Sequence, residues 1–196
     1  MEITQSSGQI KLDAQVSRFL EDARESWSDW NVSPKDGKIL YDLVISGGFK
    51  NIVDIGTSTG HSAIWLAWAA AKTGGKVFTI EAHKERFDIA LENFRKSGVM
   101  GYIDARFGNG HDLVPVIEGP VDFVFCDADK DWYLNYFQIL EQKIVVNGCF
   151  AAHNVLWAGH SKINLFLGYL KKNPAYHTYL EKGSGEGISV SRRMKE

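Results

Sequence analysis

The stretch Val53-Asp54-Ile55-Gly56-Thr57-Ser58-Thr59-Gly60-His61-Ser62 decides how this chain folds. Its first three residues complete a segment with three β-branched apolar side chains, Ile52, Val53 and Ile55, which predicts a strand over 51–55. Two glycines then permit a tight turn, and residues 61–71 carry the small and apolar side chains of a buried helix. A strand, a glycine-bearing turn and a helix in this order form the first half of a βαβ unit, in which the strands are parallel.

The same alternation continues along the chain. Strands are predicted over 76–80, 102–107, 121–126 and 148–152, and helices over 84–97, 132–143 and 162–172. Earlier helices are predicted from Leu12 to about Glu25 and from the N-cap Ser33 to Gly47. Residues 176–180 and 188–191 flank a glycine-rich turn and predict a final hairpin.

These elements predict an α/β fold with a doubly wound, mainly parallel, seven-stranded Rossmann-like sheet and a C-terminal antiparallel hairpin strand. We expect a single domain over 1–196, with residues 1–30 as an N-terminal helical extension and residues 1–10 frayed.

Composition narrows the class of protein. Hydrophobic residues make up 44% and charged residues 23% of the chain, as in globular proteins. A formal net charge of −2 gives no general basic field for nucleic acid. The sequence shows neither a signal peptide nor an apolar run of 18 residues, so we expect a cytoplasmic location. Cys126 and Cys149 lie in apolar runs and are predicted to be buried free thiols.

The glycine-bearing loop predicts a nucleoside ligand. Ser58 stands where the dinucleotide fingerprint has its middle glycine, which disfavours a pyrophosphate and with it a nicotinamide dehydrogenase. Glu81 ends the second strand, where a carboxylate can accept hydrogen bonds from ribose hydroxyls.

A second group of polar residues follows the fourth and fifth strands. Asp127-Ala128-Asp129-Lys130-Asp131 follows one, and His153-Asn154 follows the other. Because adjacent parallel strands end at one edge, Asp127, His153 and Asn154 should share a crevice, where their side chains could bind a divalent cation. We expect Asp129 or Asp131 to cap the next helix.

These motifs together resemble the catechol O-methyltransferase-like family, O-methyltransferase family 3, of class I S-adenosylmethionine-dependent methyltransferases. The resemblance runs from about residue 15 to the end. It is carried by 53–62, by Asp127-Ala128-Asp129-Lys130 with Tyr133, by Asn154-Val155-Leu156-Trp157 with Gly159, and by Asn31-Val32-Ser33-Pro34 with Gly37.

The resemblance implies a role for each matching residue. Asp127 and Asn154 would bind a metal, and Lys130 would assist deprotonation of the acceptor hydroxyl. The cofactor would be S-adenosylmethionine. Its methionine end would be held by Val32, Ser33, Asp54 and Ser62, and the loop after the first strand would contact it through Gly56, Thr57 and Gly60. Glu81 would bind the ribose, the adenine would be bordered by Ala82, Asn109, Gly110 and His111, and Asp127 would lie beside the cofactor.

One departure concerns the reaction. The family has an aspartate where this chain has His153. Two routes stay open: His153 joins Asp127 and Asn154 around a metal, with zinc or manganese favoured over magnesium, or His153, with an ordinary pKa near 6.5, acts as general base without a metal. The segment after Gly159 is also shorter than in the family, which predicts an open acceptor pocket or one closed by another subunit.

The predicted function is methyl transfer to a hydroxyl of a small, aromatic, catechol-like acceptor, with Trp30, Trp132 and Trp157 as apolar walls. Two alternatives are a tRNA hydroxyuridine O-methyltransferase and a degenerate member that binds the cofactor without turnover. The resemblance also implies a homodimer.

Overall fold

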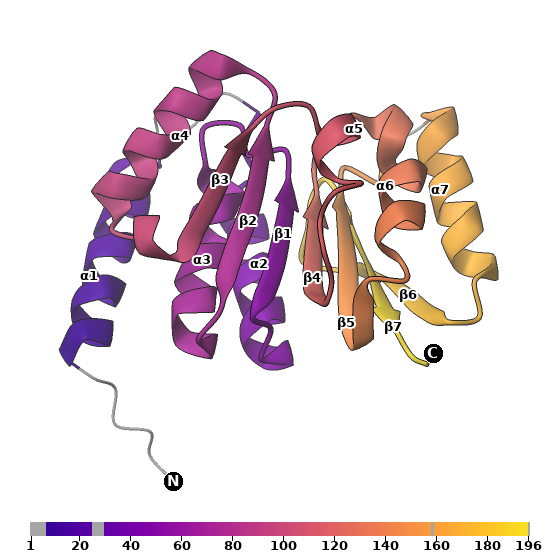
Figure 1. The fold of residues 1–196 in the computed structure, drawn as a ribbon, viewed down its shortest axis with the longest axis horizontal. Helices are drawn as coiled ribbons and strands as arrows, with labels where there is room; N and C mark the ends of the chain where they lie inside the picture. Colours follow the sequence, from indigo (N-terminus) through magenta and orange to yellow (C-terminus); the bar gives the residue numbers. More distant parts are fainter. Residues whose placement is uncertain (1–6, 25–29, 158, 196) are drawn as a thin grey trace, which may run out of the picture.

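The computed structural model describes residues 7–24, 30–157 and 159–195. Seven strands form one sheet in the order β3-β2-β1-β4-β5-β7-β6 (Figure 1). The first five are parallel, and β7 is antiparallel to both β5 and β6. Their bounds are β1 Asn51–Ile55, β2 Lys76–Glu81, β3 Ile103–Phe107, β4 Val121–Cys126, β5 Ile144–His153, β6 Tyr176–Glu181 and β7 Ile188–Arg193. The predicted fold class is confirmed.

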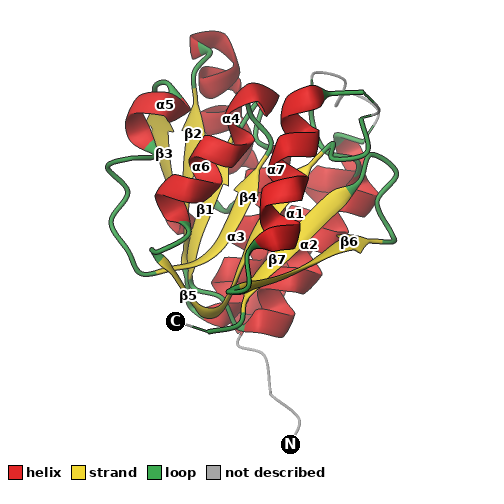
Figure 2. Cartoon of the chain, turned by 90° about the vertical axis from the view of Figure 1, so that its right-hand side faces the viewer, coloured by secondary structure: helices red, strands yellow, loops and turns green. Residues whose placement is uncertain are grey.

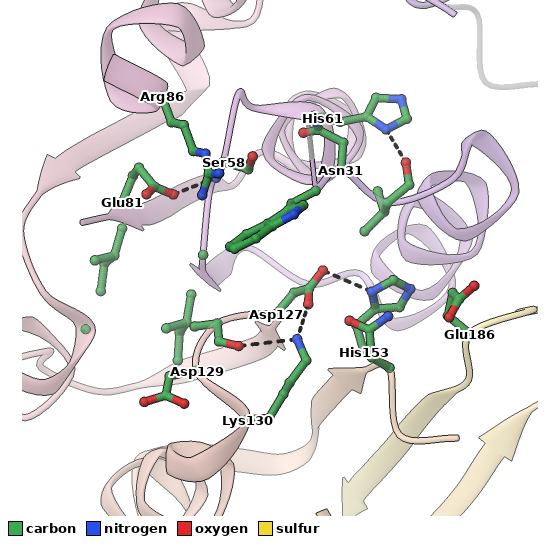
Figure 3. A pocket seen from close by; sticks show the side chains of 18 of the residues that line it. Asn31, Ser58, His61, Glu81, Arg86, Asp127, Asp129, Lys130, His153 and Glu186 are labelled. Carbon is green, nitrogen blue, oxygen red and sulfur yellow. Dashed lines mark hydrogen bonds and ion pairs between the residues drawn. The ribbon is translucent and has the colours of Figure 1, made fainter. Parts of the chain in front are cut away.

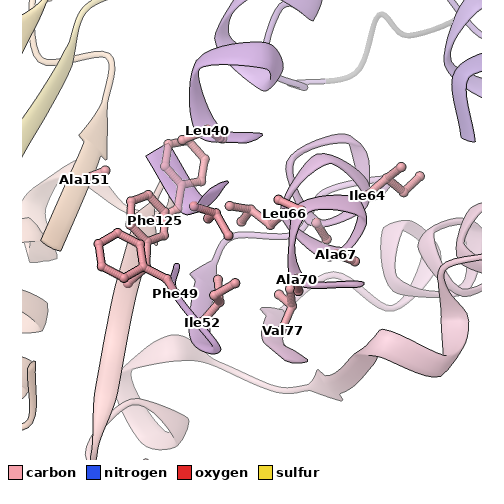
Figure 4. Packing of buried hydrophobic residues seen from close by; sticks show 14 of the residues in the cluster. Leu40, Phe49, Ile52, Ile64, Leu66, Ala67, Ala70, Val77, Phe125 and Ala151 are labelled. Carbon is pink, nitrogen blue, oxygen red and sulfur yellow. The ribbon is translucent and has the colours of Figure 1, made fainter. Parts of the chain in front are cut away.

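Helices cover both faces of this sheet (Figure 2). One core joins residues of α1 to α4 with Phe123, Phe125 and Ile188, and the other joins α6 and α7 with Val124 and Phe150. Figure 4 shows part of the first core, with Leu66 and Ala67 of α3 beside Ile52 and Phe125 of the sheet. The helices are α1 Ser7–Asp22, α2 Pro34–Gly47, α3 His61–Thr73, α4 Lys84–Ser97, α5 Gly110–Leu113, α6 Tyr133–Leu140 and α7 Ser161–Lys172. None of the described helices is long and apolar enough to cross a membrane.

The strand order reverses between β1 and β4, since β1 pairs with β2 on one side and with β4 on the other. Connections from these strands leave in opposite directions, so a crevice opens at their carboxyl ends. The loop after β1 enters this crevice, and the loops after β2, β4 and β5 border it.

Most predicted elements lie within a few residues of their observed bounds. Helix α1 begins at Ser7, inside the stretch expected to be frayed, and β5 begins at Ile144, four residues before the predicted strand. The short helix α5 was not predicted; the Asn109 side chain caps it by accepting from the His111 N–H. The predictions for residues 1–6 and 25–29 concern segments outside the described residues. Cys126 and Cys149 are buried and free, as predicted.

Candidate functional site

A cavity of about 1220 Å³ lies at the carboxyl ends of the strands (Figure 3). Pockets for single small ligands measure roughly 300–1,000 Å³, so this cavity has room for two small molecules side by side. Of the predicted site residues, those that line it are Val32, Ser33, Gly56, Glu81, Ala82, Asn109, Gly110, His111, Asp127, Lys130, His153 and Asn154.

The loop after β1 depends on backbone conformations that L side chains rarely adopt. Gly56 has φ of 100°, and a Cβ there would collide with the carbonyl oxygen of Asp127. Ser58 also has a positive φ, 48°, and its N–H donates to the Glu81 carboxylate at 2.7 Å. The loop after β1 is thereby locked against the ends of both β2 and β4.

Glu81 is the best-positioned carboxylate for a polyol ligand. One oxygen accepts from the Ser58 N–H and the other from the His83 N–H at 2.8 Å. Each carboxylate oxygen has a second lone pair, so the group can still accept from hydroxyls in the cavity. Figure 3 shows Glu81 and Ser58 on the same side of this space.

The segment before α2 is tied to the start of α3. The Asn31 amide donates to Thr59 Oγ1 at 2.8 Å, and the Val32 carbonyl oxygen lies 2.6 Å from His61 Nδ1. Since the Trp65 indole donates to His61 Nε2, the His61 proton resides on Nδ1 and points at Val32. Burial lowers the pKa of His61 to about 4, so the ring is neutral and holds this wall without adding charge.

Four predicted cofactor residues lie behind the cavity wall. Asp54 accepts from Thr79 Oγ1 at 2.7 Å and from Ser62 Oγ at 3.3 Å, and Thr57 shares a hydrogen bond with Thr79. Burial raises the pKa of Asp54 to about 7. Gly60 caps the start of α3. These residues shape the loop from below, and the direct cofactor contacts of Asp54, Thr57, Gly60 and Ser62 stay predictions.

Opposite charges meet at the ends of β4 and β5. One Asp127 oxygen accepts from Lys130 Nζ at 2.7 Å, and the other lies 2.9 Å from His153 Nδ1 (Figure 3). Burial opposes ionisation of Asp127, but the hydrogen bonds from His153 and Lys130 outweigh it and lower its pKa. The crevice predicted from the strand ends therefore exists, and Asn154, with φ of 56°, lines it as well.

Asp36 completes this group and was not predicted. It lies in the first turn of α2, is 1% exposed, and places Oδ2 3.3 Å from His153 Nε2. The same oxygen accepts from the hydroxyl of the N-cap Ser33 at 3.0 Å. Burial disfavours a charged His153, but the carboxylates of Asp127 and Asp36 outweigh that cost and raise the pKa of His153 to about 9.

The outer part of the cavity is aromatic and polar. Trp30 and Trp157 line it and are 78% and 61% exposed, and the Arg86 guanidinium lies 4.4 Å from the Trp30 ring centroid. Trp132, predicted as a third apolar wall, is not among the residues that line the cavity; its ring stacks on that of His111, which does line it, with the centroids 3.6 Å apart. Asp129 caps the 3₁₀ turn Lys130–Trp132, as predicted for one of the two aspartates. Gly185 and Glu186 of the β6–β7 turn also line the cavity and were not predicted.

Comparisons with known proteins agree with the motifs. The O-methyltransferase (Methyltransf_3) family model matches residues 5–164. Caffeoyl-CoA O-methyltransferase of Medicago sativa is 34% identical over 198 residues, covering 88% of this chain and 78% of the relative. Catechol O-methyltransferase of Niastella koreensis is 37% identical over 112 residues, covering 55% of this chain and 50% of the relative. Several other relatives are covered over only 55–58% of their length.

A solved structure supports the fold. The O-methyltransferase from Bacillus cereus in complex with SAH superposes with a TM-score of 0.76 at 24% identity, covering 98% of this chain and 93% of that one. At this identity the likeness shows the fold alone. The family assignment rests on the model match and the Medicago relative: the chain belongs to the O-methyltransferase family and is an S-adenosylmethionine-dependent O-methyltransferase, as its motifs predicted.

Proposed function

We propose that this protein transfers the methyl group of S-adenosylmethionine to a hydroxyl of a small aromatic acceptor of the catechol class. One observation carries the proposal: the Glu81 carboxylate and the Asp127–Lys130 pair face the same cavity from the ends of β2 and β4. A nucleoside at Glu81 and an acceptor hydroxyl at Lys130 would then lie side by side.

The cavity residues fit the cofactor. Glu81 accepts from the ribose hydroxyls, Ala82 and the Asn109–His111 turn border the adenine, and Val32 and Ser33 line the methionine end. His111 is fixed by its stacking on Trp132, so it offers a flat wall to a base. The cofactor, when bound, supplies an electrophilic methyl on a sulfonium.

Catalysis by this chain consists of positioning and charge. In the overall reaction the acceptor oxygen forms the new C–O bond, the C–S electron pair returns to sulfur, and the hydroxyl proton leaves to solvent. A phenol has a pKa of about 10, so it is mostly neutral at pH 7. The Lys130 ammonium, anchored on Asp127, favours the phenolate by donating to its oxygen, and the fixed walls orient that oxygen.

The residues expected to bind a metal do not fit one. The Asp127 carboxylate already has two cationic neighbours, Lys130 on one oxygen and His153 on the other, and these would repel a metal ion there. Both ring nitrogens of His153 face carboxylates and offer no lone pair to a metal. Across residues 7–24, 30–157 and 159–195 no group of three or more His, Cys, Asp or Glu side chains is placed to hold a metal ion. We therefore assign no step to a metal.

The charges of the cavity favour a small acceptor over a polyanion. A tRNA substrate would need a basic surface around the opening. Within the described part of the chain, the charged lining side chains are Arg24, Arg86, Lys130 and His153 against Glu81, Asp127, Asp129 and Glu186, so the lining has no excess of positive charge. The exposed rings of Trp30 and Trp157 suit an aromatic acceptor instead.

Two measurements test the proposal. Calorimetry should show binding of S-adenosylhomocysteine and no binding of NAD, and turnover on a panel of catechols should release one S-adenosylhomocysteine for each methyl transferred. Firm cofactor binding with no turnover on any hydroxylated aromatic would favour the degenerate alternative. The homodimer and the cytoplasmic location stay predictions, which light scattering and cell fractionation would test.

A further inference from the structure

Four ionisable side chains form one continuous chain beneath the acceptor end of the cavity. Asp36 of α2 contacts His153 at the end of β5, His153 contacts Asp127 at the end of β4, and Asp127 contacts Lys130. The successive distances are 3.3, 2.9 and 2.7 Å. By the family resemblance, this is the place of a divalent metal.

The geometry leaves His153 neither of its two expected roles. A metal ligand and a general base both need a ring nitrogen with a free lone pair. Nδ1 faces Asp127 and Nε2 faces Asp36, and a carboxylate can only accept, so both nitrogens serve as donors. A ring that donates from both nitrogens carries a positive charge.

We infer that His153, held between Asp36 and Asp127, supplies the fixed positive charge that a divalent metal supplies elsewhere in the family, and that Asp36 is its positioning residue. The catalytic role given to this charge rests on the proposed methyl transfer, whereas the protonation of His153 rests only on its contacts. Two carboxylates, one imidazolium and one ammonium balance to zero, so the buried charges compensate one another. Ser33 fixes Asp36, and the α2 N-terminus favours its negative charge.

Other side chains pack around His153 and hold it in place. The Tyr133 hydroxyl donates to the His153 backbone oxygen at 3.0 Å, and the Phe125 ring packs against the imidazole. The charged or titratable groups that face His153 from the packed elements are Asp36 from α2, Asp127 and Lys130 from the β4 end, Tyr133 from α6, and Glu186 from the β6–β7 turn (Figure 3). With the side chain only 5% exposed, solvent screens this arrangement little.

The first test is metal binding, which needs no turnover. Mn²⁺ would be titrated into the purified protein and followed by electron paramagnetic resonance, with saturating S-adenosylhomocysteine. We expect no stoichiometric binding to wild type, whereas His153→Asp, which frees Asp127 and adds a carboxylate, should bind Mn²⁺ at least tenfold more tightly. His177→Asp is the matched control, since His177 lies at the opposite end of the β6–β7 pair from the His153 contact. One tightly bound Mn²⁺ in wild type that His153→Gln abolishes would overturn the inference.

The second test observes the ring directly, and its deciding spectrum is recorded on the wild-type protein, so that result depends on no variant that might fail to fold. Nitrogen-15 imidazole spectra at pH 7.5 should show protons on both nitrogens of His153. In Asp36→Asn the ring should titrate at lower pH than in wild type, with S-adenosylhomocysteine affinity unchanged and kcat reduced more than KM is raised. A wild-type ring with one protonated nitrogen at pH 7.5 refutes the inference. If cofactor binding fails while both protons are seen, the proposed function is wrong and the charge assignment stands.

Discussion

Replacing His153 by glutamine should change the pH dependence of folding stability in a defined window. The folded pKa of about 9 lies above the ordinary value of 6.5, because Asp127 and Asp36 favour the charged ring. A group with a raised pKa contributes stability that is fully present below the unfolded pKa and is lost as pH rises through the folded one. The contribution should therefore fade between about pH 6.5 and pH 9.

The magnitude follows from the same two values. Each pKa unit corresponds to about 1.4 kcal/mol, so a rise from 6.5 to about 9 corresponds to on the order of 3 kcal/mol of unfolding free energy. His153 is almost fully buried, so this figure needs no reduction for solvent screening. Glutamine can form hydrogen bonds at this position but carries no charge, which isolates the ionic part.

The assay is urea unfolding followed by tryptophan fluorescence at pH 7, 8 and 9.5. Below pH 7 the stability also depends on Asp54, because burial raises its pKa to about 7. The stability that its protonation contributes is lost as pH rises from about 3.8 to about 7. Between pH 7 and pH 9.5 the difference between wild type and His153→Gln should shrink by about 2.5 kcal/mol, because part of the full value is already lost at pH 7. The exposed position His177, as His177→Gln, serves as the control. A difference that stays level from pH 7 to pH 9.5 would show that the folded ring is neutral and that the reasoning is wrong.

Three further changes test the rest of the site. Glu81→Ala should weaken S-adenosylhomocysteine binding by about 10- to 100-fold in calorimetry, because hydrogen bonds to a charged group contribute roughly 1.5–3 kcal/mol; unchanged affinity would refute the ribose assignment. Lys130→Ala should lower kcat while cofactor affinity stays nearly constant, and the opposite pattern would place Lys130 in cofactor binding. Gly56→Ala should lower Tm by more than Gly74→Ala, because both positions have a positive φ but only a Cβ at Gly56 meets the Asp127 backbone. Equal shifts in thermal unfolding would mean that the collision is relieved at little cost.

The fold was predictable because its signals are local. The alternation of apolar runs and helical periodicity gives the strand and helix sequence, and the Gly56 turn gives the parallel connection. The beginning of β5 was mispredicted because Asn147-Gly148 is an ordinary turn signal. In the structure Asn147 takes φ of 69° inside the strand, near an irregularity in the β4–β5 register, and pairing continues on both sides. Local sequence does not distinguish a turn from such a bulge.

Helix α1 illustrates a long-range cause. Its early residues are polar and give little helical signal, yet Asp13 accepts from Trp68 at 2.6 Å and from Lys72 at 2.7 Å. These contacts anchor α1 on α3 across more than fifty residues of sequence. The Asp13–Lys72 pair is half-buried, and no property of residues 7–13 alone indicates it.

Only the site residues that lie at the ends of strands could be predicted to come together. Residues at the ends of neighbouring parallel strands meet at one edge, and this rule brought Asp127, His153 and Asn154 together correctly. The rule is silent about helices, and Asp36 reaches His153 from the first turn of α2 across 117 positions. In the sequence Asp36 is one acidic residue near a helix start, where carboxylates are common.

Asp36, which the sequence did not reveal as a partner, determines how His153 is interpreted. Taken alone, an imidazole in place of a carboxylate suggests either a ligand for a softer metal or a general base. Both roles need the neutral ring. With a carboxylate on each side, the neutral ring would leave an acceptor oxygen facing a bare nitrogen lone pair in a buried space, which is unfavourable. The charged ring donates a hydrogen bond to one oxygen of Asp127 and to one oxygen of Asp36. Its positive charge neutralises the negative charge of Asp36, as the Lys130 ammonium neutralises that of Asp127. The histidine and the aspartate of α2 therefore form one functional unit, whose charge only the folded structure makes evident.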